Sequence, residues 1–554
     1  MRKWRILLGM VFFTAMSVCR VAGGATEFNS VENKWCRDEL DIPNRPLKSR
    51  TTPAGTRLPL ISLALSGGGY RAMLFHVGTL RRLNDAGLLP ELSVVSSVSG
   101  GSIVAGLLAQ RWYRLGFNDE GKATRFIEEI ENPLRDLASR TTDVSAAIGS
   151  MLPFMSAASI QASRFDELLF EGALLQDIAP GPDQARLRPD QRPRPLFIFN
   201  ATSLQTGELW QFRPTAMGGS ITHWTSTANI RLSQAVAASS GFPPVLSPLE
   251  LDLSNLDVDR DWHDCVDGRD NPFGIRADNE PNRDLPRQEK QALSVSDDHW
   301  KLAQALRRKV FLVDGGVRDN LGLGTIEEIN RLRRQRSDAG SGERTVILIS
   351  DGGAATVPNA DVSGFWPTQV MRVMNIMSDQ PDEVRVANIV RRSAERVAAA
   401  GYAPTQWSND DHCPPPDIPE KLVQARRIVV QDPKTDAYAY WSIRRMPKLH
   451  RSYQCPPQDK SSPWMEKEVR ALAVVPTRMS EMPKTLQARL INWGYLAAHH
   501  GLPYVDDAWV HRDLFQRWLA PCNLPYGKKD TLDGKKETES AAEANCLLPL
   551  PRIE

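Results

Sequence analysis

Two turns with the residue types needed for acyl transfer follow one another in the first fifth of the chain. Each comes after a short apolar run: Gly67-Gly68-Gly69-Tyr70-Arg71 is the first turn, and Ser97-Val98-Ser99-Gly100-Gly101 is the second. A serine hydroxyl needs a nearby base to attack an ester, and the carbonyl oxygen that becomes negative needs hydrogen-bond donors. An apolar helix-like run follows each turn, so each presents the unpaired N–H groups of a helix N-terminus. We expect Ser99 to be the nucleophile and the glycine turn to hold the oxyanion.

The details of both turns fit these roles. The serine turn resembles the G-x-S-x-G elbow that exposes a nucleophile between a strand and a helix, with Ser97 in place of the first glycine. The glycines of the first turn lack Cβ atoms, which permits close approach to a ligand, and Arg71 is expected to steady the loop. A dinucleotide-binding loop is the alternative for these glycines, but a single glycine match that ends in Ala72 is a weak signal.

Two aspartates compete for the role of base. Asp314 and Asp351 each end an apolar run and are followed by two glycines, a pattern typical of the carboxyl end of a sheet strand, where α/β proteins place catalytic groups. A Ser-His-Asp triad is the rival arrangement, and its histidine would come from a group that follows the aspartates in the chain: His412, His450, His499 or His500. His76 falls within the first predicted helix, where a structural role is expected.

Hydrophobic periodicity predicts the elements that position these residues. Strands are expected at 61–65, 92–97, 195–202, 310–313 and 346–350, with a hairpin return at 209–212. Helices are expected at 73–83, 103–109, 232–240, 370–397 and 486–498. The strand, helix, strand, helix order at the start predicts an α/β fold with a parallel sheet and right-handed crossovers.

Bulk composition excludes some partners. The chain has 554 residues, with 68 Lys plus Arg against 66 Asp plus Glu and a net charge of +2. Nucleic acid is therefore not an expected partner. An acidic stretch between Leu251 and Trp300 reads as a polar insertion rather than a calcium loop, because Trp262 stands where an EF-hand needs glycine. No metal or other cofactor is expected.

The N-terminus has the layout of a secretory signal peptide. A basic start is followed by the apolar run Ile6–Phe13 and by small residues up to Ala25. Export to a periplasm or to the medium is the prediction, with an uncleaved anchor or a lipid-modified Cys19 as the alternatives. Of the seven cysteines, those after Cys19 could form up to three disulfides, whose pairing the spacing does not define.

The order of three motifs resembles that of the patatin-like phospholipase family. These are Gly67-Gly68-Gly69-Tyr70-Arg71, then Ser97-Val98-Ser99-Gly100-Gly101, then Asp314-Gly315-Gly316, which continues into a turn ending at Gly322. The resemblance covers about Leu58 to Gly353 and implies a three-layer α/β/α fold that hydrolyses lipid acyl esters with a Ser-Asp dyad and no metal.

The resemblance also implies a role for each motif residue. Ser99 would be the nucleophile and Asp314 the base. The oxyanion loop would comprise Gly67, Gly68 and Gly69 with Arg71, and the supporting residues would be Ser97, Gly100, Gly101, Gly315 and Gly316. The predicted partner is a lipid or acyl ester, with contact to a membrane or lipid surface. A histidine-triad esterase of the α/β-hydrolase type and a catalytically silent lipid-binding module are the competing hypotheses.

Five segments make up the predicted domain organisation. They are a signal peptide at 1–25, a lead-in at 26–58, the catalytic domain at 59–355 with its insertion near 251–300, a helical and mixed C-terminal extension at 356–520 packed on the core, and a mobile tail at 521–554. The apolar residues between 145 and 170 fit either a lid or lipid-facing surface, or a helix packed on the core.

Overall fold

The computed structural model describes most of the predicted catalytic domain and parts of the C-terminal region. The described residues are 59–142, 156–180, 187–219, 223–227, 229–243, 248–253, 309–336, 345–354, 384–386, 437–444, 469–501, 517 and 523–526. The predicted signal peptide, the lead-in before residue 59, nearly all of the polar insertion and most of the predicted helix at 370–397 lie outside these residues.

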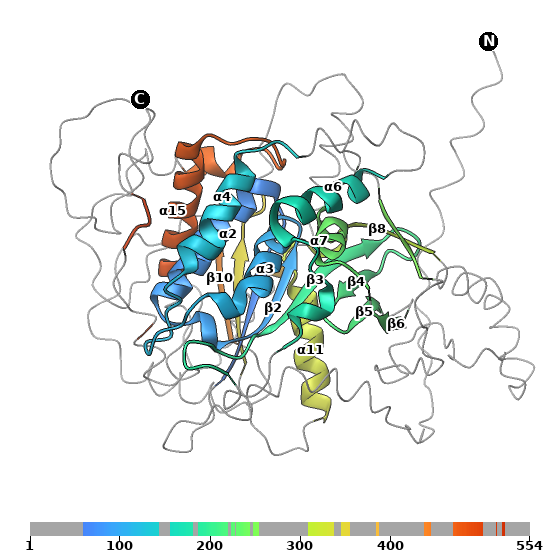
Figure 1. The fold of residues 1–554 in the computed structure, drawn as a ribbon, viewed down its shortest axis with the longest axis horizontal. Coiled ribbons are helices and arrows are strands. Elements are labelled where there is room, and N and C mark those ends of the chain that lie inside the picture. The colour runs from blue at the N-terminus through green and yellow to red at the C-terminus, as the bar shows by residue number, and fades with distance from the viewer. Residues whose placement is uncertain are drawn as a thin grey trace, which may run out of the picture.

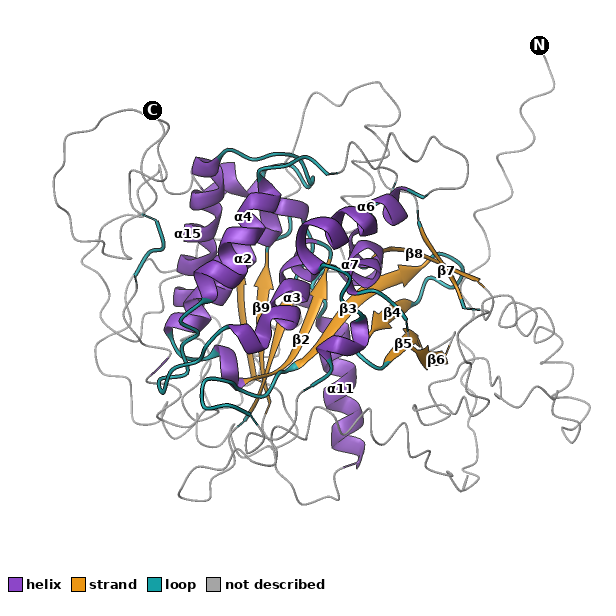
Figure 2. Ribbon diagram, in the orientation of Figure 1, coloured by secondary structure: helices purple, strands orange, loops and turns teal. Residues whose placement is uncertain are grey.

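One ten-stranded sheet organises the described chain (Figures 1 and 2). Its strands are β1 (Leu60–Leu65), β2 (Leu92–Val98), β3 (Leu196–Ser203), β4 (Leu209–Phe212), β5 (Ala216–Gly219), β6 (His223–Ser226), β7 (Leu249–Asp252), β8 (Lys309–Asp314), β9 (Thr345–Asp351) and β10 (Ala437–Ser442). The main order is β10-β9-β1-β2-β3-β4-β5-β6, and the first five strands of this order are parallel. The strands after β3 are antiparallel, including the hairpin return expected at 209–212. The predicted mostly parallel sheet is confirmed.

Helices cover both faces of the sheet, so the three-layer α/β/α arrangement is also confirmed. The longer helices that bear on the site are α2 (Gly69–Asp85), α3 (Gly100–Arg111), α6 (Ala157–Phe165), α7 (Leu232–Ser240), α11 (Leu323–Arg336) and α15 (Lys484–Gly501). The helix α11 lies on the opposite side of the sheet from α2, α3 and α7 (Figure 2).

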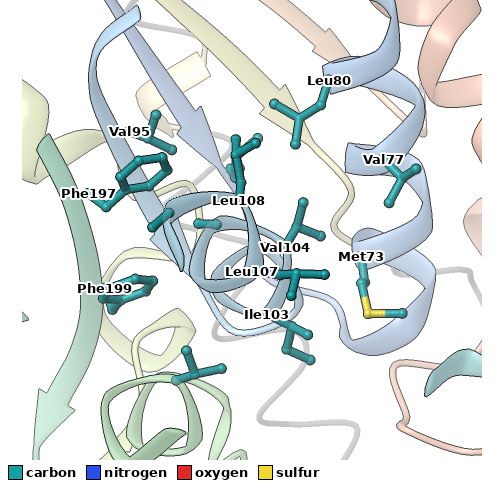
Figure 3. Close-up of a cluster of buried hydrophobic side chains, with 14 of the residues drawn as sticks. Met73, Val77, Leu80, Val95, Ile103, Val104, Leu107, Leu108, Phe197 and Phe199 are labelled. Carbon is teal, nitrogen blue, oxygen red and sulfur yellow. The ribbon is translucent and has the colours of Figure 1, made fainter. Parts of the chain in front are cut away.

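Alternating side chains of the strands supply the two cores between these layers. On β1 and β2, Leu63 and Val95 belong to the larger cluster under α2 and α3, whereas Ala64 and Val94 belong to the cluster under α11. The helix α3 is buried from Gly100 to Ala109 because it lies between α2 and the sheet, and Figure 3 shows its apolar side chains facing both neighbours. Burial on all sides fixes the helix whose N-terminus carries Ser99.

The strand β8 departs from the pattern expected for Asp314. Both aspartates were expected at the carboxyl ends of strands in a parallel sheet, but β8 runs antiparallel to β3. The strand β2 pairs with β3 as far as Val98 opposite Asn200, and β8 pairs with the next residues of β3 and ends with Asp314 opposite Ala201. The carboxyl ends of β2 and β8 therefore approach each other along β3.

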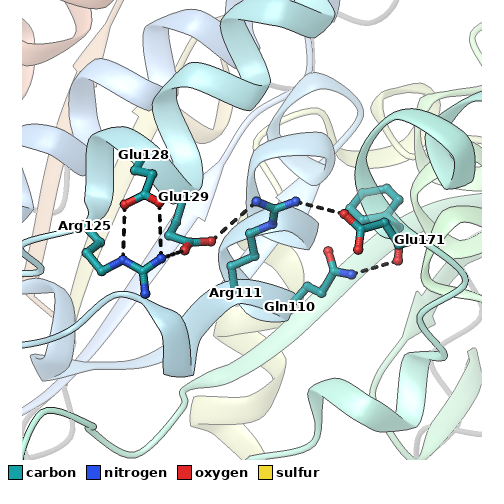
Figure 4. Close-up of polar contacts among 7 residues, drawn as sticks. Gln110, Arg111, Arg125, Glu128, Glu129 and Glu171 are labelled. Atoms are coloured by element: carbon teal, nitrogen blue, oxygen red, sulfur yellow. Dashed lines mark hydrogen bonds and ion pairs between the residues drawn. The ribbon is translucent and has the colours of Figure 1, made fainter.

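Polar contacts tie the far end of α3 to its neighbours (Figure 4). The Arg111 guanidinium bridges Glu129 and Glu171, at 3.4 Å each, and the Gln110 amide donates to the Phe170 carbonyl at 2.7 Å. These partners belong to short π-helical turns or to the residue that follows one, and Phe170 is buried. Residues 157–170 of the region considered as a lid thus pack on the core, while residues 145–155 lie outside the described part.

The helix α15 crosses α2 at a distance that only glycine permits, and the two helices lie side by side in Figure 1. A Cβ added to Gly78 of α2 would lie 1.9 Å from the Ile491 carbonyl oxygen, and one added to Gly494 of α15 would lie 1.8 Å from the Phe75 carbonyl oxygen. Backbone therefore touches backbone at this crossing, and neither glycine has room for a side chain.

Substitution of Gly494 by alanine is expected to lower the free energy of unfolding by about 3 kcal/mol, because the added methyl must push the two helices apart. Denaturant unfolding followed by circular dichroism measures the change. Gly241→Ala is the control, because its Cβ would meet no atom closer than 3.4 Å. Equal losses in the two variants would contradict the close crossing.

The C-terminal region contributes more than α15 to the described fold. Residues 523–526, which fall within the predicted mobile tail, lie against this helix: the Asn492 amide exchanges hydrogen bonds with the backbone N–H and carbonyl of Tyr526, at 3.0 and 2.8 Å. Among the described residues, no helix has the length and apolar character needed to span a membrane.

Candidate active site

Ser99 sits at a sharp turn between β2 and α3. Its φ of 51° lies in the left-handed region that non-glycine residues rarely adopt, and its side chain is buried except for a small exposed fraction of 4%. Strained backbone of this kind persists only where the surroundings hold it. The predicted elbow is therefore present, with a serine rather than a glycine in the strained position.

The Ser99 hydroxyl donates a hydrogen bond to the Asp314 carboxylate. This contact follows from the topology, because Ser99 comes directly after β2 and Asp314 is the last residue of β8, and these two ends approach each other along β3. The Gly316 N–H donates to Asp314 Oδ1 at 2.7 Å and orients the carboxylate. Two residues separated by more than two hundred positions are thus brought into contact.

Burial raises the pKa of the Asp314 carboxyl from 3.8 to about 7, because a charged carboxylate loses its hydration. The hydrogen bonds from the Gly316 N–H and the Ser99 hydroxyl oppose this shift by stabilising the ionised form. A carboxyl with a pKa near neutrality can both accept and return a proton, which is the property expected of a general base in acyl transfer.

Asp351, the rival for the role of base, is occupied elsewhere. Its Oδ2 accepts hydrogen bonds from Tyr440, Ser442 and Arg444 at 2.7, 3.0 and 3.1 Å. Although burial opposes ionisation, Arg444 and these hydrogen bonds hold the pKa of Asp351 below its usual value. The carboxylate therefore joins β9 to β10 and their following loop as a fixed charge.

The predicted histidines do not complete a triad in the described structure. The His76 ring lies within hydrogen-bond distance of the Ser66 carbonyl oxygen and the Ser350 hydroxyl, at 2.9 Å each, and burial lowers its pKa to about 4. His499 and His500 lie in α15, while His412 and His450 fall outside the described residues. Within the described ranges, no histidine contacts Ser99 or Asp314.

The glycine turn lies directly against the serine turn. Cβ atoms added to Gly100 and Gly101 would lie 2.2 Å from the Gly69 carbonyl oxygen and 2.5 Å from the Leu65 carbonyl oxygen. The two glycines after Ser99 are therefore needed for the close approach of the turns. Gly68 and Gly69 themselves have φ values of 140° and 59°, so the glycine turn also has a backbone that other residues would adopt only with strain.

The three glycines differ in what their N–H groups do. The Gly67 N–H donates to the Asn320 carbonyl oxygen at 3.0 Å, so it is engaged within the protein. For the N–H groups of Gly68 and Gly69 the structure gives no acceptor among the described residues. Both glycines lie at the N-terminus of α2, where the helix dipole favours negative charge.

The Arg71 side chain is fully buried next to the glycine turn and links it to two other segments of the chain. Its Nε donates to the Gly352 carbonyl oxygen at 3.0 Å, and its Nη1 donates to the Val475 carbonyl oxygen. The Tyr70 N–H donates to the Arg478 carbonyl oxygen at 3.0 Å. The expectation that Arg71 steadies this loop agrees with these contacts, and residues 475–478 are a part of the site that sequence reasoning missed.

Ser97 shows why the first elbow position tolerates a serine. Its hydroxyl donates to the Ile198 carbonyl oxygen at 3.1 Å and accepts from the Ser102 hydroxyl at 3.0 Å. Ser97 thus links β2 to β3 and to the first turn of α3, instead of crowding the turn.

Three further polar residues near Ser99 and Asp314 were not predicted as site residues. Asn200 donates from its amide to the Ser96 hydroxyl and the Ser97 carbonyl oxygen, at 2.8 and 2.9 Å. Ser239 and Asn320 contact the serine and glycine turns through their backbones. The polar ends of the strand at 195–202 and of the helix at 232–240 were the available signal for Asn200 and Ser239, but packing decides whether such residues face the site.

Possible metal ligands were compared only among the described residues. Within those ranges, no group of three or more His, Cys, Asp and Glu side chains is arranged to hold an ion. The acidic insertion lies almost wholly outside the ranges.

Comparisons with known proteins find a family model and a relative that match part of the chain. Residues 63–325 match the sequence model of the family described as patatin-like phospholipase. A Saccharomyces cerevisiae protein described as a meiotic phospholipase is 42% identical over 55 residues, a stretch that is 10% of this chain and 9% of that protein.

Solved structures give more distant similarities. Human GIVD cytosolic phospholipase A2 has a TM-score of 0.41 at 13% identity, over 87% of this chain and 64% of that one. VipD from Legionella pneumophila has a TM-score of 0.23 at 11% identity, over 84% of this chain and 76% of that one. The match to the patatin-like phospholipase model spans both turns and Asp314, so the resemblance seen in the order of the three motifs is confirmed over residues 63–325.

Proposed function

We propose that this protein is a serine-dependent lipid acyl hydrolase with Ser99 as nucleophile and Asp314 as base. The observation that carries the proposal is the hydrogen bond from the Ser99 hydroxyl to a buried carboxyl whose pKa lies near 7. The family match supports a lipid ester hydrolase, and the description of the yeast protein as a phospholipase agrees with it. A diacylphospholipid is accordingly the substrate class with which to begin.

In the first half of the reaction, the ionised Asp314 accepts the proton of the Ser99 hydroxyl as Oγ bonds to the ester carbonyl carbon. The tetrahedral intermediate then collapses, and Asp314 returns the proton to the departing alcohol. The acyl group remains as an ester on Ser99. In the second half, Asp314 takes a proton from water, the hydroxide attacks the acyl-enzyme, and the proton returns to Ser99 as the fatty acid leaves.

The developing oxyanion needs donors that no protein acceptor occupies. Because the Gly67 N–H is engaged by Asn320, we assign this role to the N–H groups of Gly68 and Gly69 at the N-terminus of α2. The Arg71 guanidinium supports these donors by holding the turn, since its described hydrogen bonds go to Gly352 and Val475. Of the four residues expected from the sequence, we thus propose Gly68 and Gly69 as the oxyanion donors and Arg71 as a supporting side chain.

A fluorophosphonate probe, which reacts covalently with an activated serine, tests the proposal on the folded wild-type protein. We expect one adduct, found on the peptide that contains Ser99, and a loss of phospholipid and short-ester hydrolysis in proportion to labelling. Denatured protein is the control and is expected to remain unlabelled. Hydrolysis that persists after complete labelling, or a folded protein that neither reacts nor hydrolyses esters, would count against a serine hydrolase.

Export and contact with a lipid surface stay predictions of the sequence. The apolar N-terminal run on which export depends lies outside the described residues. Contact with a lipid surface is proposed from the substrate class, because the acyl esters of phospholipids are held in membranes.

A further inference from the structure

Ser239 lies in the last turn of α7, between the two residues of the dyad. Its carbonyl oxygen accepts the N–H of Ser99 at 3.1 Å and the N–H of Gly315 at 3.3 Å. Ser99 is the proposed nucleophile, and Gly315 directly follows the proposed base. One backbone carbonyl therefore holds the turn that carries each partner of the dyad.

The side chain of Ser239 adds a second hold on the nucleophile. Its Oγ accepts the Ser99 N–H at 3.0 Å and donates to the Asn200 carbonyl oxygen at 2.6 Å. Because the hydroxyl hydrogen points to Asn200, the oxygen can accept the Ser99 N–H, and the Ser102 hydroxyl oxygen lies 2.8 Å from the same atom. The side chain is fully buried, so water does not replace either bond.

The hydrogen bond from Ser239 to Asn200 reaches β3 at the point where both β2 and β8 end. Asn200 lies on β3 opposite Val98, the residue before Ser99, and the next residue of β3 lies opposite Asp314. A Cβ on Gly315 would lie 2.3 Å from the Asn200 carbonyl oxygen, so the turn after Asp314 presses on the same atom. The Ser239 hydroxyl is thus fixed by the strand against which both β2 and β8 end.

We propose that Ser239 is a positioning residue whose hydroxyl holds the Ser99 backbone at its positive φ and so keeps the nucleophile on Asp314. The inference rests on the proposed dyad. Without the Oγ acceptor, the Ser239 carbonyl oxygen alone accepts the Ser99 N–H, so the Ser99 backbone is free to shift from its positive φ and to move its hydroxyl from the carboxylate. Small displacements of a reacting group lower the rate of the chemical step more than substrate binding.

The test compares Ser239→Ala with Ser240→Ala. The Ser240 hydroxyl is also buried and donates to the Val236 carbonyl oxygen at 2.7 Å, so Ser240→Ala removes a hydroxyl from the same helix without touching the dyad. We expect Ser239→Ala to lower kcat about 10- to 100-fold with KM little changed. Ser240→Ala is expected to keep the wild-type kcat, even where the two variants lose similar thermal stability.

The pH profile separates positioning from a general loss of structure. The Ser99 hydrogen bond lowers the pKa of Asp314, so weakening this bond should move the acid limb of kcat/KM to higher pH in Ser239→Ala. Ser240→Ala should keep the wild-type limb. Should Ser239→Ala not fold, Ser239→Cys repeats the comparison, since sulfur is a weaker acceptor of nearly the same shape.

The outcomes distinguish this inference from the function on which it rests. A folded wild type that the fluorophosphonate does not label at Ser99 contradicts the dyad and this inference together. A labelled wild type, with Ser239→Ala or Ser239→Cys equal to Ser240→Ala in both kcat and acid limb, contradicts the role of Ser239 alone. A lower kcat together with a displaced acid limb supports it.

Discussion

Replacement of Ser99 by alanine is expected to lower the rate of ester hydrolysis by about 10⁴-fold or more, because alanine lacks the hydroxyl that is proposed to form the acyl-enzyme. Hydrolysis of a diacylphospholipid and of a short-chain ester measures the loss, and titration with the fluorophosphonate confirms that the labelled site is gone. Wild-type rates in a folded Ser99→Ala variant would show that another residue attacks the ester.

A glycine at the same position separates the chemical role of Ser99 from its backbone strain. Alanine and glycine both remove the hydroxyl, but only glycine adopts a φ of 51° without a steric penalty. We expect Ser99→Gly to be inactive like Ser99→Ala and more stable than it by about 1 kcal/mol in denaturant unfolding. Equal stability of the two variants would mean that the surroundings do not hold strain at this residue.

Substitution of Asp314 by asparagine is expected to lower kcat/KM by about 10²- to 10⁴-fold, because the amide cannot accept the proton of Ser99. In the wild type, activity should fall as the pH drops below about 7, where the carboxyl becomes protonated. Asp314→Asn should lack this acid limb. An unchanged limb in Asp314→Asn would assign the titration to another group.

Although Asp314→Asn is expected to lower activity, it is expected to raise the stability of the fold at high pH. The pKa of Asp314 is raised by folding from 3.8 to about 7, so its contribution to stability is fully present below the unfolded value and is lost as the pH rises through 7. Asp314→Asn removes this loss and should be more stable than wild type at pH 8, by about 4 kcal/mol at most. Unfolding free energies at pH 5 and pH 8 measure the difference.

Asp351→Asn is the matched control for both measurements. Its carboxylate pairs with Arg444, whose side chain is only 15% exposed, so removal of the charge should lower the free energy of unfolding by about 3 kcal/mol. The folded fraction should keep the acid limb of the wild type, because Asp351 is already ionised by its neighbours. The substitution at Asp314 is thus expected to lower activity and raise stability at pH 8, whereas the substitution at Asp351 is expected to lower stability and leave the acid limb unchanged.

Sequence patterns were informative for features that depend on neighbouring residues. The turns at Gly67 and Ser99 and the strand that ends at Asp314 follow from local runs of apolar and small residues, and the order of the motifs identified the two residues that the structure brings together. Periodicity also predicted α15, found at Lys484–Gly501 where 486–498 was expected.

Features that depend on distant packing could not be predicted in this way. The strand β8 pairs with the edge of β3 that β2 leaves unpaired after Val98. The local sequence of β8 does not indicate this partner or the antiparallel direction. The engagement of the Gly67 N–H depends on the fold of the turn at Asn320. The role of Ser239 likewise depends on where the end of α7 docks, since any serine near a helix end has the same local sequence signal.

The hold of residues 475–478 on the glycine turn has a consequence for how the protein is made. A ribosome completes Ser99 and Asp314 well before it reaches Val475, which lies 404 positions after Arg71. Until that segment emerges, Arg71 and the Tyr70 N–H lack the carbonyl acceptors that Val475 and Arg478 provide. A nascent chain that has not yet reached Val475 therefore carries Ser99 and Asp314 without these contacts on the glycine turn, and we expect such a chain to lack hydrolytic activity.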